Sequence, residues 1–195
     1  MKDAIRFLFR IIFKIFYRVE VVNREAVPQK GPVILCANHL GALDMFFIGF
    51  KIKRLVHYMA KEELFKIPVI APIIRYLGAF PVKRGKADLE SIKTALRLLK
   101  EGHVVGILPE GTRTMKKDIK TIRAKPGVAL LAIKSGVPVL PVALCGNYKL
   151  FSKVRVVFGE PFMLEADRNK RYSGAELSGM SAGIMEKVYA LMKEV

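Results

Sequence analysis

Short apolar runs that alternate with helical patterns place the strongest constraint on the fold of this chain. Residues 32–37, 56–60 and 104–108 have the length and the unbroken apolar character of buried strands. Between them, residues 87–101 repeat apolar side chains at helical spacing and end at Gly102. Strands that alternate with helices in this way predict an α/β domain, with a mixed, partly parallel sheet flanked by helices.

The remaining elements follow from the same patterns. Further strands are predicted at 79–82, 136–144 and 154–158, and further helices at 43–52, 128–135 and 181–193. Pro138 and Pro141 each lack a backbone N–H, so they predict that 136–144 is an edge strand or an irregular one. Residues 20–31 are polar and contain proline and glycine, which predicts a connection.

The polar stretch NHLGALD, at residues 38–44, follows the first apolar run. Histidine is the side chain most often used as a general base, and Asp44 is the nearest carboxylate that could orient His39. On a regular helix, residues five apart lie about 140° apart around the axis, so these two side chains would not meet. We therefore predict a strand, a tight turn in which Gly41 supplies unusual backbone angles, and a helix that begins near Leu43 or Asp44. A helix N-cap at Asp44 and a plain loop histidine are the alternative from these residues alone.

Two further polar clusters follow predicted strands. Residues 83–86 place three cations around a glycine, a composition that suits a phosphate and also occurs in solvated loops. After the strand at 104–108, Glu110 could fix hydroxyls or an arginine, Gly111 allows close backbone approach, and Arg113 offers a two-pronged donor for phosphate. Because α/β folds collect their chemistry at the ends of strands, we expect the three clusters to converge on one face.

The net charge restricts the classes of partner. The chain has 34 lysines and arginines against 17 acidic residues, which is a formal net charge of +17. A surface this basic attracts nucleic acid, anionic lipid or phosphorylated small molecules. The hydrophobic content of 52% and the lack of a recognisable nucleic-acid-binding motif favour lipid. Cys36 and Cys145 lie in apolar runs without metal-binding spacing, which predicts buried thiols in a reducing cytosol.

Residues 2–19 form a predicted helix that is apolar on all sides but one. Its cations recur every four residues, at Lys2, Arg6, Arg10, Lys14 and Arg18. These charges interrupt the apolar residues too often for a transmembrane span or a signal peptide. We expect the helix to lie in the membrane interface, and a helix packed on the protein's own core is the alternative.

The segment at 67–77 is unusually apolar for a connection. Pro68 and Pro72 interrupt its helical pattern. Its composition suits the core and also the wall of a groove for a hydrocarbon chain, and the sequence favours the core.

Four blocks resemble, in order, those of the glycerolipid acyltransferase family, and most closely those of the bacterial 1-acylglycerol-3-phosphate acyltransferases. The blocks are NHLGALD at 38–44, FPVKR at 80–84, PEGTRT at 109–114 and VPVLPV at 137–142. The resemblance covers residues 33 to about 145. One departure is Gly41, where many members of the family carry serine, and it leaves His39 and Asp44 in place.

The resemblance implies the transfer of a fatty acyl group from a thioester to the sn-2 hydroxyl of 1-acylglycerol 3-phosphate, giving phosphatidic acid. In this scheme His39 is the general base and Asp44 orients it. The implied substrate-binding residues are Lys61, Phe80, Arg84, Glu110, Gly111, Thr112 and Arg113. The scheme needs no metal and no cofactor, with acyl-CoA or acyl carrier protein as co-substrate. No G-x-S-x-G elbow occurs, in keeping with direct transfer rather than a serine nucleophile.

The implied partners are an anionic phospholipid membrane, lysophosphatidic acid and the acyl donor, and no nucleic acid. Residues 1–30 would be a membrane-associating helix and its connection, and residues 31–195 the catalytic domain. The expected location is the cytoplasmic face of the cell membrane, as a peripheral or monotopic protein. Three alternatives remain: an acyltransferase for glycerol 3-phosphate or a lyso-aminolipid, a non-catalytic phospholipid-binding protein, and a nucleic-acid-binding domain.

Overall fold

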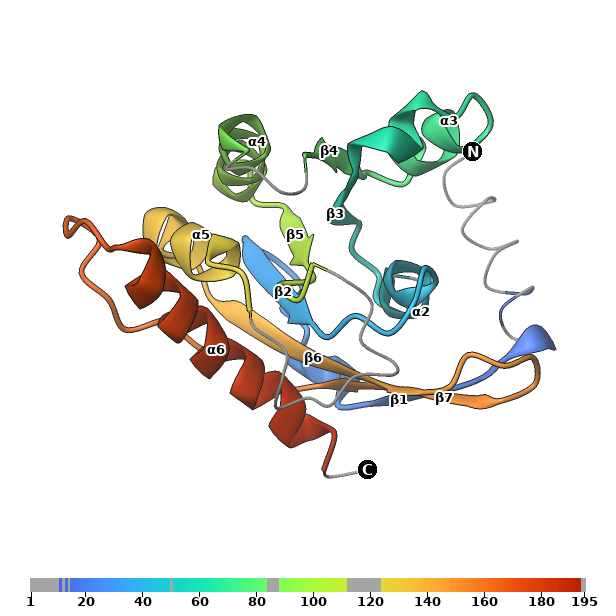
Figure 1. The fold of residues 1–195 in the computed structure, drawn as a ribbon. Helices are drawn as coiled ribbons and strands as arrows, with labels where there is room; N and C mark the ends of the chain where they lie inside the picture. Colours follow the sequence, from blue (N-terminus) through green and yellow to red (C-terminus); the bar gives the residue numbers. More distant parts are fainter. Residues whose placement is uncertain are drawn as a thin grey trace.

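The computed structural model describes residues 11, 13, 15–49, 51–83, 88–111 and 124–193. They form a seven-stranded sheet in the order β1-β7-β6-β2-β5-β3-β4 (Figure 1). Neighbouring strands run parallel, except that β6 and β7 are antiparallel, which confirms the predicted mixed sheet. The strands are β1 (Arg18–Val22), β2 (Val33–Ala37), β3 (Val56–Lys61), β4 (Phe80–Val82), β5 (Val104–Ile107), β6 (Val139–Gly146) and β7 (Lys153–Phe158).

Helices connect the strands and cover both faces of the sheet. One side carries α2 (Asp44–Gly49) and α3 (Ile70–Tyr76), and the other carries α4 (Leu89–Lys100), α5 (Gly127–Ser135) and α6 (Gly174–Leu191) (Figure 1). Two 3-10 turns are η1 (Arg24–Ala26) and η2 (Glu62–Lys66). Within the described ranges, no helix is both long and apolar enough to cross a membrane.

The core consists of two apolar layers, because successive side chains of a strand point to opposite faces of the sheet. On β2, Ile34 and Cys36 belong to the layer against α4, α5 and α6, whereas Leu35 and Ala37 belong to the layer against α2. Every residue of β2 is buried, as expected of a central strand with helices on both faces. The first polar residues after β2 therefore emerge at the edge of a rigid, fully packed sheet.

β6 is not an edge strand, which was one of the two predicted forms, because β2 pairs with it on one side and β7 on the other. The N–H of Val139 donates to the carbonyl of Phe162 on the β7 side, so by alternation the nitrogen of Pro141 faces that side too. The ladder between β6 and β7 starts only at Val142, which pairs with Phe158. Pro141 therefore occupies an interior strand without removing a ladder hydrogen bond.

β1 is a strand where the sequence predicted the end of a helix and a connection. It pairs in parallel with β7, from Arg18 beside Lys153 to Val22 beside Val157. Its residues alternate between exposed and half-buried, so it lacks the apolar run that marks the central strands. β1 joins the segment before residue 31 to the sheet.

The described end of the predicted N-terminal helix has two different sides. Phe13 and Tyr17 pack on the aromatic rings of α2, with ring centroids 5.0 to 5.8 Å apart. Ile15 and Phe16 are exposed. One side thus packs on the core and another faces solvent. The cations Lys2, Arg6, Arg10 and Lys14 lie outside the described residues.

Two helices differ in extent from the prediction, whereas α4 and α5 match it. α2 ends at Gly49, before the predicted end at 52, and α6 begins at Gly174, before the predicted start at 181. A capping box starts α6, because the Ser173 side chain accepts from Glu176 N and the Glu176 side chain accepts from Ser173 N. This S-x-x-E signal was present in the sequence, ahead of the apolar positions on which the prediction depended.

Candidate active site

Asn38 holds the chain at the point where it leaves β2. Its side-chain amide donates to the carbonyl of Leu144 at 3.0 Å, and the N–H of Leu144 donates to Asn38 Oδ1 at 2.7 Å. Asn38 is buried, so loss of either bond would leave a polar group with neither a protein partner nor water to replace it. The side chain thereby extends the pairing of β2 with β6 by one step and holds the backbone of His39 next to it.

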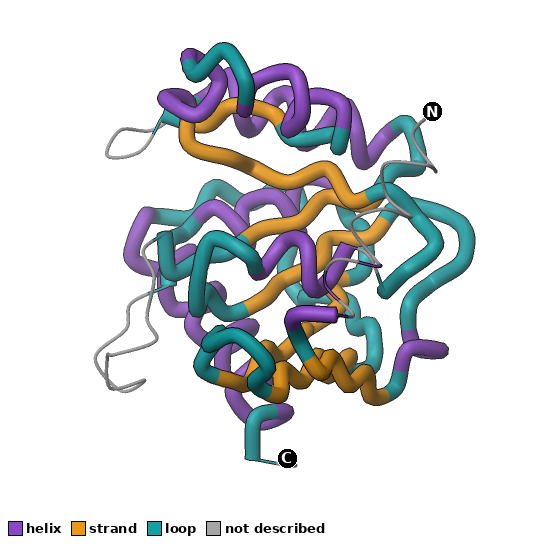
Figure 2. The backbone as a smooth tube through the Cα atoms, turned by 90° about the vertical axis from the view of Figure 1, so that its right-hand side faces the viewer, coloured by secondary structure: helices purple, strands orange, loops and turns teal. Residues whose placement is uncertain are grey.

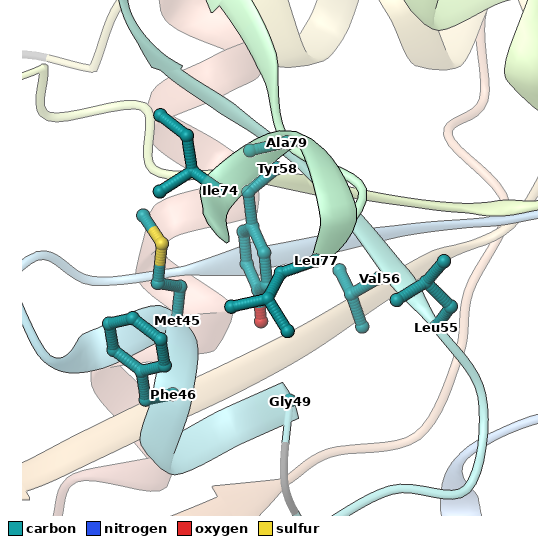
Figure 3. A pocket seen from close by; sticks show the side chains of 9 residues that line it. All are labelled: Met45, Phe46, Gly49, Leu55, Val56, Tyr58, Ile74, Leu77 and Ala79. Carbon is teal, nitrogen blue, oxygen red and sulfur yellow. The ribbon is translucent and has the colours of Figure 1, made fainter. Parts of the chain in front are cut away.

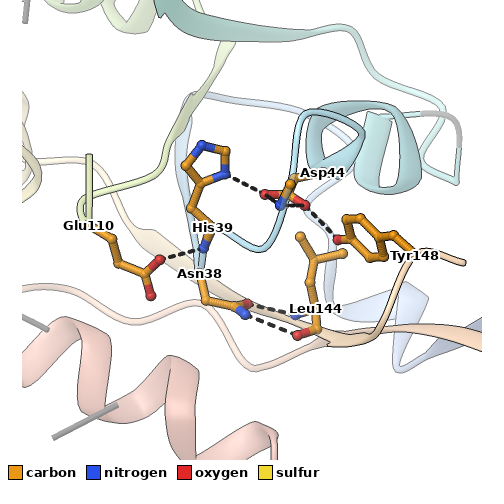
Figure 4. A network of polar contacts seen from close by, with 7 residues as sticks. Asn38, His39, Asp44, Glu110, Leu144 and Tyr148 are labelled. Carbon is orange, nitrogen blue, oxygen red and sulfur yellow. Dashed lines mark hydrogen bonds and ion pairs between the residues drawn. The ribbon is translucent and has the colours of Figure 1, made fainter. Parts of the chain in front are cut away.

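The predicted turn brings His39 and Asp44 together. β2 ends before it, α2 begins at Asp44, and the N–H of Asp44 donates to Gly41 O across the turn. His39 Nδ1 lies 2.5 Å from Asp44 Oδ2 (Figure 4). An ionised carboxylate only accepts hydrogen bonds, so the contact puts the ring proton on Nδ1 and makes Nε2 the acceptor of a neutral ring. Figure 4 shows this second nitrogen on the side of the ring away from Asp44.

Asp44 is buried and receives hydrogen bonds from two further groups. The N–H of Gly41 lies 2.9 and 3.1 Å from its two oxygens, and the hydroxyl of Tyr148 lies 2.5 Å from Oδ1. Burial raises the pKa of Tyr148, and the charge of Asp44 raises it further, so the phenol keeps its proton and donates it. These donors hold the buried carboxylate of Asp44 in position against His39.

Gly41 serves the turn in a way that differs from the prediction. Its backbone is not among the left-handed conformations that several other glycines adopt. A Cβ atom at this position would lie 2.9 Å from Cδ2 of Tyr148, which is closer than side chains normally approach. Gly41 therefore makes room for the Tyr148 ring, which also packs on Phe47 of α2 with centroids 4.8 Å apart.

Glu110 connects the end of β5 to the same turn. Cys36 pairs with Ile107, so β2 and β5 end at one edge of the sheet. Glu110 is buried, and its two oxygens accept from the N–H of His39 and from the hydroxyl of Tyr189 on α6, both at 2.7 Å. Burial and the hydrogen bond to Glu110 raise the pKa of Tyr189, so this phenol is the donor. Glu110 thus positions the backbone of His39.

The other predicted site residues lie in different surroundings. Lys61 ends β3 with its Nζ 3.1 Å from Glu63, and Gly111 has a left-handed backbone covered by the stem of Lys125. Phe80 is buried in the core layer against α4, so a substrate contact there stays a prediction. Arg84, Thr112 and Arg113 lie outside the described residues. The first and third polar clusters converge through His39 and Glu110.

Sequence reasoning missed the structural roles of Asn38, Tyr148 and Tyr189. Asn38 belongs to the motif that was singled out, so its place beside His39 was a usable signal. The two tyrosines carried no local signal, because each reaches the site from an element distant in sequence.

A mostly apolar pocket lies between α2, β3 and α3 (Figure 3). Burial raises the pKa of Tyr58 in its wall, and the charge of Asp44 raises it further. Met45 and Phe46 of the lining follow Asp44 directly on α2, so the pocket lies beside the site. The hydroxyl of Tyr58 is buried without a hydrogen-bond partner among the described residues. The lining residues are Met45, Phe46, Gly49, Leu55, Val56, Tyr58, Ile74, Leu77 and Ala79.

Comparisons with known proteins give consistent matches. A family model described as acyltransferase matches residues 18–145. The chain is 32% identical over 188 residues to 1-acyl-sn-glycerol-3-phosphate acyltransferase of Bacillus subtilis (strain 168), covering 93% of this chain and 92% of that protein. It is 31% identical to the chloroplastic 1-acyl-sn-glycerol-3-phosphate acyltransferase BAT2 of Brassica napus, covering 69% of this chain and 39% of that one. The crystal structure of the 1-acyl-sn-glycerophosphate (LPA) acyltransferase PlsC from Thermotoga maritima matches with a TM-score of 0.73 and 29% identity, over 98% of this chain and 79% of that one.

Proposed function

The chain belongs to the acyltransferase family, and we propose that it transfers a fatty acyl group from an acyl thioester to the free sn-2 hydroxyl of 1-acylglycerol 3-phosphate, giving phosphatidic acid. The observation that carries the proposal is the contact of His39 with Asp44 at the end of β2. The Bacillus subtilis relative, which is matched over nearly its whole length, supports the choice of acceptor.

The proposed reaction is a direct transfer in which His39 handles one proton. His39 Nε2 takes the proton of the acceptor hydroxyl as the oxygen forms a bond to the thioester carbonyl carbon. The tetrahedral intermediate then expels the thiolate, which takes the proton from the imidazolium and leaves as the free thiol. Asp44 stabilises the imidazolium between these steps, and Tyr148 and Gly41 hold the carboxylate in line with His39.

The pocket between α2, β3 and α3 supports a hydrocarbon chain as part of the substrate. Its walls are apolar apart from the Tyr58 hydroxyl, and its lining includes Met45 and Phe46, which follow Asp44 directly on α2. A chain lying there would have its polar end near His39. This use is the one that sequence analysis left open for residues 67–77, since Ile74 and Leu77 supply part of the wall.

Arg84 and Arg113 are proposed to bind the phosphate of the acceptor, with Lys61 beside them. Replacing either arginine by alanine is expected to raise KM for 1-acylglycerol 3-phosphate by about tenfold to a hundredfold, since a hydrogen bond to a charged group contributes about 1.5–3 kcal/mol. Steady-state kinetics with each substrate varied in turn measure the effect. Arg97→Ala is the matched control, because Arg97 pairs with Glu101 on the exposed side of α4. If KM rises for the acyl donor and not for the acceptor, the arginines bind the donor instead.

Tyr148 is proposed to act through Asp44. Tyr148→Phe removes the hydroxyl while the ring still fills the space over Gly41, so kcat is expected to fall about tenfold and KM for the acceptor to change less than about twofold. Steady-state kinetics that give kcat and KM separately, together with the pH profile of kcat, measure the change. Tyr172→Phe removes a hydroxyl that accepts from Asp167 N in the loop before α6, and it should leave both constants unchanged. Unchanged kcat in Tyr148→Phe would reduce Tyr148 to a packing role.

Membrane association follows from a lipid acceptor and product. We propose a peripheral or monotopic position at the cytoplasmic face of the cell membrane. The exposed Ile15 and Phe16 at the end of the N-terminal segment support it, together with the formal net charge of +17.

Mass spectrometry of the products tests the proposed function directly. The full chain is incubated with a mixture of 1-acylglycerol 3-phosphate, glycerol 3-phosphate and a lyso-aminolipid, once with acyl-CoA and once with acyl carrier protein. The expected product is phosphatidic acid, and the donor that supports it identifies the co-substrate. Acylation of another acceptor would replace the proposed substrate. No transfer with either donor would favour a phospholipid-binding protein.

A further inference from the structure

The segment that leads into α3, together with the first turn of α3, carries an apolar surface that the proposed reaction does not use. The apolar composition of this segment predicted a place in the core, but the structure divides its side chains between the core and the surface. Ala71 and Ile74 are buried, whereas four large apolar side chains point outward. We call these four the α3 patch: Ile67 (41% exposed), Val69 (73%), Ile70 (36%) and Ile73 (39%). A single exposed apolar side chain is ordinary on a protein surface, but a contiguous group on one short segment indicates an interaction surface.

Cations flank the α3 patch. Lys66 precedes it and Arg75 follows it, and both are exposed. The guanidinium of Arg75 lies over the Phe65 ring, 5.6 Å from its centroid. No acidic residue occurs between Lys66 and Arg75 in the sequence. Apolar side chains between cations match the layering of an anionic bilayer, in which acyl chains lie under negative headgroups.

A second apolar surface lies on the same side of the molecule. We call it the turn patch: Ile15, Phe16, Leu150 and Phe151, of which the last two are each 63% exposed. The N–H of Phe151 donates to Phe16 O at 2.7 Å, which joins the two segments. Figure 1 shows α3 and the turn between β6 and β7 both at the right-hand side, the side that Figure 2 turns toward the viewer.

α2, which begins at Asp44, connects the two patches. Met45 and Phe46 line the pocket together with Ile74 and Leu77 of α3. On its other side, Phe47 packs on Tyr148 in the turn that carries Leu150 and Phe151. α2, whose first residue Asp44 contacts His39, therefore lies between the two patches.

We propose that the α3 patch is a membrane-docking surface that binds an anionic phospholipid bilayer in addition to the N-terminal segment. Val69 and Ile73 insert among the acyl chains, and Lys66 and Arg75 contact the headgroups. The inference rests on the proposed function only in that a lipid acceptor explains why the site faces a bilayer. The binding itself can be measured without turnover.

A tryptophan reporter tests the contact directly, because the chain contains no tryptophan. Val69→Trp in the full chain is mixed with vesicles of phosphatidylcholine and phosphatidylglycerol in equal parts. Its emission is expected to shift to the blue and to be quenched by brominated acyl chains. Leu89→Trp is the matched control, because Leu89 is similarly exposed but lies on α4, across the sheet. Equal spectra of Val69→Trp with and without vesicles would overturn the proposal.

Co-sedimentation measures how much the patch contributes to binding. The double variant Val69→Glu and Ile73→Glu is expected to lower the partition coefficient on these vesicles by about tenfold or more, because two acids replace inserted apolar groups. Leu89→Glu with Met163→Glu makes the same charge change at two exposed apolar positions away from this side, and it should stay within about twofold of the unchanged chain. Equal losses in both double variants would assign the effect to net charge and overturn the proposal.

Two further measurements distinguish bilayer docking from self-association and from a loss of catalysis. Light scattering after gel filtration reports whether the patch joins two copies of this chain. A dimer that Val69→Glu and Ile73→Glu separates, with vesicle binding unchanged, would replace the bilayer by a second copy. Product analysis with water-soluble short-chain substrates reports the chemistry separately: lost vesicle binding with retained turnover supports the docking surface. Retained vesicle effects without any acyl transfer would support the docking surface and reject the proposed function.

Discussion

His39→Ala lowers the turnover number for acyl transfer by about two to four orders of magnitude, the loss expected when a general base is removed. Nε2 of His39 is the proposed acceptor of the hydroxyl proton, and no alanine atom can replace it. The loss should appear in kcat with saturating acceptor and donor. It is measured by following thiol release from the thioester.

The protein is expected to remain folded in this variant. Asp44 keeps the hydrogen bonds from Gly41 and Tyr148, and Glu110 still accepts from the backbone of residue 39. His103→Ala is the matched control, because His103 is exposed next to Glu101 and should retain full turnover. Near-normal turnover of a folded His39→Ala protein would remove His39 from the proposed mechanism.

Asp44→Asn lowers the turnover number by about four orders of magnitude, as the same exchange does in a Ser-His-Asp triad. The asparagine oxygen can still accept from Tyr148 and Gly41, so the side chain keeps its position. Its NH2 group then faces His39 Nδ1 and donates to it, which moves the ring proton to Nε2. Protonated Nε2 can no longer accept the proton of the substrate hydroxyl.

Acceptor affinity should survive this exchange, because Asp44 does not contact the acceptor in the proposed mechanism. KM for 1-acylglycerol 3-phosphate and the thermal unfolding temperature are therefore measured together with kcat. Asp167→Asn is the control, since the Asp167 side chain accepts a local bond from Asn169 N in an exposed loop. Full turnover in Asp44→Asn would mean that the carboxylate merely starts α2, which was the alternative from the sequence.

The HxxxxD turn was predictable from local chain geometry. Asp44 follows His39 by five positions, so the distance between them depends on one strand end, one turn and one helix start, all of which leave sequence signals. The reason for Gly41 was not predictable. Its smallness makes room for Tyr148, which is 104 residues from Asp44 in sequence.

The apolar segment at 67–77 shows a limit of hydrophobic composition as evidence. Its residues satisfied the pattern of a core segment, yet the α3 patch faces outward. Apolar composition indicates that a segment is removed from water. It does not distinguish burial in the protein core from contact with a lipid surface. Only the position of α3 at the margin of the fold makes the distinction.

The sequence by itself determined most of the elements and the first polar contact, because the periods of apolar residues and the turn residues act over a few positions. Tertiary structure alone decided which elements meet. β6 became an interior strand because β7 returns beside it, and β1 became a strand because β7 offers it a partner. The same strand order brings Glu110 under His39 and Tyr148 onto Asp44. Such pairings depend on the summed packing of the whole sheet, which no local period of the sequence encodes.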